Sequence, residues 1–192
     1  MIIEIETKAA LDKIRARLKK MPEEMRWAIS RTLNDVAVSG RQIAVKDILA
    51  RYNIADKPVR SGMKIEKARV DRLLAIIHVS GYRFPIQMFD PVATKEGVDF
   101  EEIRGKRSSI SHVFMAVMRY GPNVFVRKGA ERGPVQKITG LSVASMVKEE
   151  TQVLPDIQAR VDEQLLKRAE FWMAEALAGK MANYGGGGGG EE

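Results

Sequence analysis

Apolar residues recur at spacings of three and four over the first fifty residues, which is the period of a helix that buries one face. Residues 7–20 form a first amphipathic segment, with Leu11, Ile14 and Leu18 on one side. A second helix is expected over residues 22–52, because a proline and two acids suit its first turn. Its predicted apolar stripe consists of Met25, Ile29, Leu33, Val36, Gly40, Ala44 and Ile48.

The middle of the chain changes to short runs rich in β-branched residues, which is typical of strands. A strong turn is expected at Tyr120-Gly121-Pro122-Asn123. No helical segment separates the runs, so the strands should pair antiparallel. Strands are expected at about 72–79, 98–103, 111–119, 124–127 and 134–139, the first of them buried.

The last third of the chain returns to helical spacing, over residues 153–179. Pro155 should lie in the first turn or at a kink, and Gly179 is a stop signal. The predicted ridge of this helix is Ile157, Val161, Leu165, Ala169, Met173 and Leu177. We expect the ridge to pack against the long helix through Ile29, Leu33 and Val36, since neither helix would be stable alone in water.

Helices, then strands, then helices indicate an α+β fold, with long N-terminal and C-terminal helices packed on a small antiparallel β-sheet. One domain is expected over residues 1–180, with helices at about 7–52, a β-rich block at about 72–139 and a helix at about 153–179. Residues 181–192 contain six consecutive glycines and are expected to be a flexible tail.

Composition narrows the class of protein. The 192 residues include no cysteine, which excludes disulfides, thiolate nucleophiles and zinc sites built on sulfur. The N-terminus is acidic where a signal peptide would be basic, and no window approaches the roughly 18 apolar residues of a membrane span. A soluble chain without a membrane partner is therefore expected.

The net charge of +7 comes from 32 basic and 25 acidic residues, which favours an anionic partner. The basic residues allow two interpretations. They contact a polyanion, or they form a solvated surface or an interface with an acidic protein. Arg119 and Arg127 are expected to lie close together across the predicted turn. The predicted partner- or DNA-binding residues are Arg104, Lys106, Arg107, Arg119, Arg127, Lys128 and Arg132.

Catalytic and metal-binding patterns are weak in this sequence. His78 and His112 lie far apart in predicted strands, without carboxylates at ligand spacing. Asp99, Glu101 and Glu102 form the only tight acidic group, and a solvated strand edge explains it better than general acid/base chemistry. No glycine-rich segment has the form of a phosphate-binding loop. We therefore expect no catalytic residues, no metal and no cofactor.

Several short segments follow one another in a recognisable order along the chain. Two of them lie upstream, at Ile29–Ala37 and Phe84–Phe89. The others are Phe114-Met115-Ala116, Gly121, Val124–Gly129, Arg132–Val135 and Ile138–Val143. In this order the segments resemble the minor tail protein Z family of long-tailed bacteriophages. The resemblance extends from Ile29 to Leu177, and it does not include the loop 93–111 or the glycine tail.

The resemblance implies a virion protein, made in the host cytoplasm, that acts in tail completion near the head-proximal end of the tail and in positioning the genome end. It implies no catalytic residues. It also implies other tail or neck proteins as partners and a homo-oligomeric ring. The basic residues add the expectation of non-specific contact with genomic DNA. The alternative is a free basic nucleic-acid-binding module without catalytic activity. A hydrolase using Asp99, Glu101 and Glu102 ranks far behind both.

Overall fold

The computed structural model describes residues 22–119, 121–129, 133–148 and 153–180. The helix expected at 7–20 and the tail expected at 181–192 lie outside the described residues. The chain forms two compact units, Met1–Ala37 with Lys67–Ile76 and Asp162–Glu192, and Val38–Glu66 with Ile77–Val161. The expectation of one domain over 1–180 stays a prediction.

The long helix α2 runs from Glu23 to Arg51, within a residue of the prediction at each end. Two acids in its first turn and an arginine in its last turn oppose the charges of the helix dipole. The predicted stripe is correct in the second half, where Gly40, Ala44 and Ile48 are buried. In the first half the stripe is wrong: Met25, Ile29 and Leu33 are only half-buried, whereas Trp27, Ala28 and Thr32 are buried.

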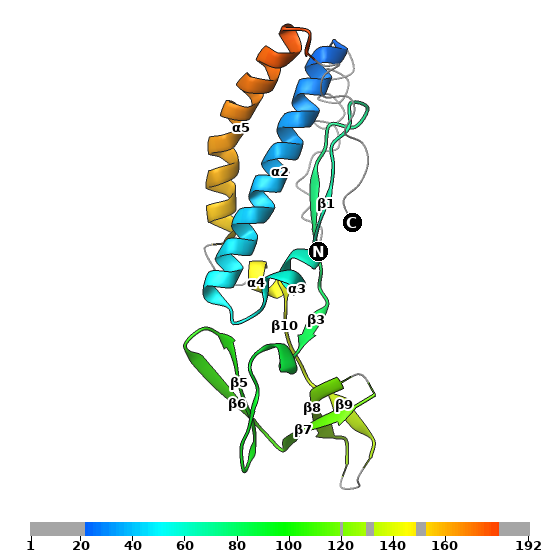
Figure 1. Cartoon of the computed structure of the whole chain (residues 1–192), viewed down its shortest axis with the longest axis vertical. Helices are drawn as coiled ribbons and strands as arrows, with labels where there is room; N and C mark the ends of the chain where they lie inside the picture. The colour runs from blue at the N-terminus through cyan, green and yellow to red at the C-terminus, as the bar shows by residue number, and fades with distance from the viewer. Residues whose placement is uncertain (1–21, 120, 130–132, 149–152, 181–192) are drawn as a thin grey trace, which may run out of the picture. The chain divides into compact units, whose positions relative to one another are not determined.

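In the first unit α2 packs against the last helix, α5, which spans Val153–Leu177 (Figure 1). The rings of Trp27 and Trp172 meet edge to face, with their centroids 5.4 Å apart. Ala28 and Ala176 are buried in the same cluster. The two helices therefore pair, as predicted. Of the predicted contact residues, Met173 packs against this cluster and Val36 is buried, whereas Ile29 and Leu33 are only half-buried.

The corrected contact between the helices has a simple geometric reason. At 100° per residue, Ile29 points about 160° away from Trp27 around the helix axis, so the two side chains cannot face the same neighbour. The prediction counted aliphatic residues and gave too little weight to the single tryptophan on each helix. On α5, Leu165 and Leu177 are accordingly exposed, and Trp172 and Ala176 are buried. Pro155 lies in the first turn, and Gly179 ends the helix with a φ of 70°.

A connection between two strands is fastened to α2 within the first unit. The side-chain amide of Asn34 donates to the carbonyl oxygen of Ala68 at 3.0 Å and accepts from the Ala68 N–H at 2.7 Å. This connection leads from β1, Met63–Glu66, to β2, Ile76–Val79. The buried strand predicted at 72–79 is thus shorter and only half-buried, because it belongs to a two-stranded sheet.

The second unit contains short helices and most of the strands. Arg83–Pro85, β3, pairs antiparallel with β10, Thr139–Ser142. A three-stranded antiparallel sheet has the order β4-β5-β6, and another has the order β7-β8-β9. The remaining bounds are α3 Asp56–Ser61, η1 Ile86–Met88, β4 Val92–Ala93, β5 Gly97–Ile103, β6 Lys106–Ser111, β7 Val113–Met118, β8 Gly121–Arg127, β9 Val135–Lys137 and α4 Val143–Lys148.

The core of the second unit joins the end of α2 to the strands and the short helices. Its fully buried side chains include Ile48, Tyr52, Phe89, Val124 and Met146. The C-terminal end of α2 is tied to β5, because Asn53 donates its backbone N–H to the carbonyl oxygen of Glu102 at 2.9 Å. These contacts set the positions from which the hairpins extend.

The α+β fold class is confirmed at the level of mixed helices and small antiparallel sheets. The described residues form several small sheets where one sheet was expected. The prediction missed β6, whose sequence Lys-Arg-Ser-Ser-Ile-Ser has no apolar alternation, because pairing with β5 holds this strand in place. The packing of the long helices on a sheet stays a prediction.

Candidate interaction surface

The sheet β7-β8-β9 separates two kinds of side chain onto its two faces. Side chains alternate along a strand, so every second residue points to the same face. On one face Val113, Val124 and Val126 pack into the core of the second unit. The opposite face therefore carries Phe114 and Phe125, together with the charged residues that follow the same alternation.

On this opposite face one row of side chains crosses all three strands. Phe114 pairs with Phe125, and Phe125 pairs with Lys137. The two phenyl rings are tilted by 34° with centroids 6.2 Å apart, which is an ordinary aromatic contact. Phe125, on the central strand, is buried, Phe114 is half-buried, and Lys137 is exposed.

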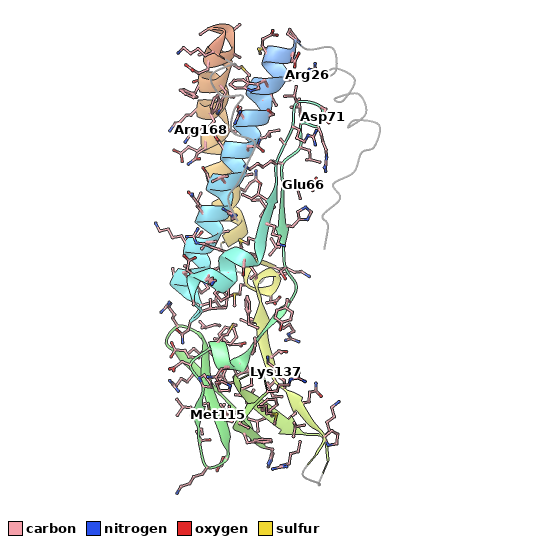
Figure 2. All side chains as sticks on the ribbon, turned by 45° about the vertical axis from the view of Figure 1, so that its right-hand side comes forward. Arg26, Glu66, Asp71, Met115, Lys137 and Arg168 are labelled. Carbon is pink, nitrogen blue, oxygen red and sulfur yellow. The ribbon has the colours of Figure 1, made fainter. Side chains whose placement is uncertain are left out.

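Arg127 completes this face from the end of β8. Its guanidinium carbon lies 4.9 Å from the centroid of the Phe114 ring, within the range of a cation–π interaction. The ring holds the side chain against the sheet, which lowers the conformational entropy that Arg127 would lose on binding an anion. We call Phe114, Phe125, Arg127 and Lys137 the aromatic–basic face; Figure 2 labels Lys137 and, on β7, Met115.

Arg127 and the adjacent Lys128 are the predicted site residues that lie on or beside this face. Lys128 is exposed and immediately follows β8. The prediction that Arg119 is close to Arg127 is wrong. The β7–β8 hairpin closes at the pair Met118–Gly121, so Arg119 is in the turn and Arg127 is six residues away along β8, roughly 20 Å.

The misplaced turn explains that error. The predicted turn at 120–123 starts too late along the chain, since Pro122 and Asn123 lie within β8 and pair with Val117 and Ala116. Gly121 has a φ of 89°, which is left-handed backbone that favours glycine at the first residue of the strand. The Gly-Pro pair was therefore correctly taken as a sign of chain reversal, and only the position of the reversal was wrong.

The residues Arg104, Lys106 and Arg107 lie in or next to the β5–β6 hairpin rather than on the aromatic–basic face. Arg104 donates its Nε hydrogen to the carbonyl oxygen of Leu49 at 2.9 Å, which satisfies one backbone acceptor near the end of α2. Arg107 forms an ion pair with Asp90 at 2.9 Å. Arg132 lies outside the described residues. The six predicted residues that the structure describes therefore lie on or beside different strands and turns.

The three clustered acids have separate partners. Asp99 accepts a hydrogen bond from the Ser109 hydroxyl at 2.5 Å, across the β5–β6 pair. Glu101 accepts from the backbone N–H of Gly105 at 2.9 Å, and Glu102 accepts from that of Leu141 at 2.8 Å. These contacts join strands and close a turn, so each carboxylate has a structural role in the hairpins.

The histidines also lie apart. His78 is exposed on β2, with its Nε2 atom 3.0 Å from a carboxylate oxygen of Glu66. His112 has a φ of 59° and joins β6 to β7. Across the described ranges, no three histidine or acidic side chains are grouped so that they could hold a metal ion. Among the helices in those ranges, none is both long and apolar enough to cross a membrane.

Sequence reasoning missed Lys137 as a site residue and used Phe114 and Phe125 only for the family resemblance. The signal was present as alternation: Phe125 and Arg127 are two residues apart, as are Val135 and Lys137. Lys137 depends on the register of β8 with β9, which alternation along each strand does not determine.

Three comparisons with known proteins gave no identification. A scan against models of protein families, a search of curated proteins and a search of solved structures each returned no match.

Proposed function

We propose that this chain is a non-catalytic structural subunit of a bacteriophage tail, acting in tail completion near the head-proximal end. Support comes from the ordered resemblance between Ile29 and Leu177 and from the roles of the polar side chains. Asp99, Glu101 and Glu102 hold strands and turns together by hydrogen bonds. This use of carboxylates suits a subunit whose task is to keep its shape under load.

The observation that carries the proposal is the aromatic–basic face. Arg127 is held over Phe114, and Lys137 lies in the same cross-strand row as both rings. Cations positioned by ring contacts and strand pairing offer a rigid surface for an anionic partner. In a tail, the partner is either an acidic surface of a neighbouring tail or neck protein or the phosphates of the genome end.

The first experiment tests location. Virions of the phage that encodes the chain are purified, and an antibody against the chain is used to detect it in intact particles and in separated tails. The proposal expects the chain in the tail fraction, at the end that joins the head. Virions without the chain, produced by cells that contain it, would overturn the proposal.

The second experiment tests the role of the face. Arg127→Glu with Lys128→Glu reverses two positive charges, and the matched control reverses two exposed lysines of α2 and α3, Lys46 and Lys57. Both double variants change the net charge equally. Loss of incorporation in the first variant alone indicates a protein contact. Normal incorporation with failed genome delivery indicates a DNA contact. If neither incorporation nor genome delivery changes, the aromatic–basic face does not have the proposed role.

A free nucleic-acid-binding module is the second candidate, because the same cations and rings could contact phosphates and bases. Binding of the wild-type chain to duplex and single-stranded DNA, measured by fluorescence anisotropy over a salt series, separates a nucleic-acid-binding module from a tail subunit that uses this face on protein. A nucleic-acid module binds tightly with a steep salt slope that Arg127→Glu with Lys128→Glu reduces. A tail subunit that uses this face on protein shows no such slope.

A further inference from the structure

Strand β7 is an open edge of its sheet. It pairs with β8 on one side, and in the described part of the chain no strand pairs with its other side. Alternate residues of an antiparallel strand direct their N–H and C=O groups to opposite sides. Three of the six residues of β7 therefore present unpaired backbone groups at the open edge, which is a template for a further strand.

The side chains of β7 do not protect this edge. Its sequence, Val-Phe-Met-Ala-Val-Met, contains no charge and no proline. Proteins usually block open edges with lysine, proline or very short strands. The edges of the neighbouring sheet follow that rule, since β4 has two residues and β6 begins with Lys106 and Arg107. On β7, by contrast, Val117 is 80% exposed and Met118 is 40% exposed.

We propose that β7 is the site where two copies of this chain join, edge to edge and antiparallel, about a two-fold axis at Ala116. The contact would produce one continuous sheet of β9-β8-β7 from each copy. The inference goes beyond the proposed function and does not depend on it. A two-fold contact is complete with two copies, so a ring would need a second and different contact.

The register follows from the exposed side chains. In an antiparallel pair with a two-fold axis perpendicular to the sheet, residues directly opposite share a face. Pairing about Ala116 places Met115 opposite Val117 of the second copy, and Met118 opposite Phe114 of the second copy. Each of the three exposed hydrophobic residues of β7 then meets an apolar side chain. Pairing about Met115 would instead place Met118 opposite His112.

Charge explains why a second copy can occupy this edge. Two chains of net charge +7 repel each other, so a contact between copies needs a segment free of charge. β7 provides six such residues, and in this register the Arg119 side chains lie at opposite ends of the contact, each opposite Val113. An uncharged strand offers no positive charge that would attract an acidic protein or the phosphates of DNA.

Disulfide trapping tests both the partner and the register, because the chain contains no cysteine of its own. In the proposed contact the two Ala116 Cα atoms are about 4.5–5.5 Å apart, a distance that a disulfide can span. Ala116→Cys should therefore form disulfide-linked dimers under mild oxidation. A mixture of Met115→Cys chains and Val117→Cys chains should form mixed dimers.

Met118→Cys is the matched control. It lies on the same strand and the same face, and Met118 is more exposed than Ala116. In the proposed register the two copies of residue 118 are offset by four residues, about 13 Å along the strand, so they cannot be linked. If disulfides formed only by random collision, Met118→Cys would form linked dimers at least as readily as Ala116→Cys. Equal or greater linking of Met118→Cys would therefore overturn the proposed register.

A second experiment tests dimerisation without any disulfide. It compares the wild-type chain with the double variant Met115→Lys with Val117→Lys. Light scattering after size-exclusion chromatography should give a dimer for the wild type at tens of micromolar and a monomer for the variant. Circular dichroism should be unchanged, since both side chains are exposed within one chain. A wild-type monomer, a larger assembly that persists in the variant, or a variant that stays dimeric would each refute pairing through β7.

Discussion

The indole N–H of Trp172 donates a hydrogen bond to Oδ2 of Asp35 across the α2–α5 contact, with 2.8 Å between the two heavy atoms. The same carboxylate oxygen is 3.8 Å from a guanidinium nitrogen of Arg168. Trp172 thus contacts α2 in two ways, through its indole nitrogen at Asp35 and through an edge-to-face ring contact with Trp27. Both contacts join α5 to α2.

Trp172→Phe should lower the free energy of unfolding by about 1–2 kcal/mol, because the ring contact is kept while a donor to a carboxylate is lost. Urea unfolding followed by circular dichroism measures the change. Asp35→Asn keeps an acceptor and should cost less. The double variant should cost less than the sum of the two single variants, since both changes affect one hydrogen bond. Simple additivity would show that this bond contributes nothing.

The corrected stripe of α2 gives a second prediction. Ile48 is fully buried in the core of the second unit, and Ile48→Ala should cost about 2–5 kcal/mol. Leu33 is only half-buried, so Leu33→Ala should cost clearly less, about 1–2 kcal/mol. Thermal and urea unfolding of both variants check the order. If Leu33→Ala lowered the free energy of unfolding as much as Ile48→Ala or more, Leu33 would have to make a further contact outside the described residues.

Two buried glycines give a third prediction. A Cβ atom at Gly97 would collide with the backbone carbonyl of Ile110 on the paired strand and lie 2.9 Å from the Cα atom of Ser111. At Gly140 a Cβ would collide with the carboxylate of Glu102, which is the end of a flexible side chain, and lie 2.9 Å from the Phe89 ring. Gly97→Ala should therefore destabilise the chain more than Gly140→Ala, by at least about 1 kcal/mol. The reverse order of melting temperatures would contradict it.

The limits of sequence-based prediction are visible in particular elements. The bounds of α2 and the stop at Gly179 were predictable because helix ends depend on local residues. The buried side of α2 near Trp27 was not, because it depends on the partner tryptophan 145 positions later in the numbering. Likewise, Arg127 of the aromatic–basic face was predicted from charge, but Lys137 required the register of β8 with β9. Long-range pairing, rather than composition, decides these positions.

Arg104, which was expected to bind a partner, contacts the end of α2 and provides the last prediction. Its Nε hydrogen bonds to the carbonyl oxygen of Leu49, and its backbone N–H bonds to that of Arg51, both at 2.9 Å. The last carbonyls of a helix have no partner within the helix, so these bonds stabilise the junction of α2 with the β5–β6 hairpin. Arg104→Met keeps most of the aliphatic stem and removes the guanidinium donor together with its positive charge.

That substitution should lower the free energy of unfolding by about 0.5–1.5 kcal/mol, the net contribution of one ordinary hydrogen bond. Lys106→Met removes the same charge from an exposed position two residues away and should leave stability within about 0.5 kcal/mol of the wild type. Urea unfolding measures stability, and the virion assay measures incorporation. If Arg104→Met is as stable as the wild type but is excluded from tails, Arg104 acts on a partner and the structural role given to it here is wrong.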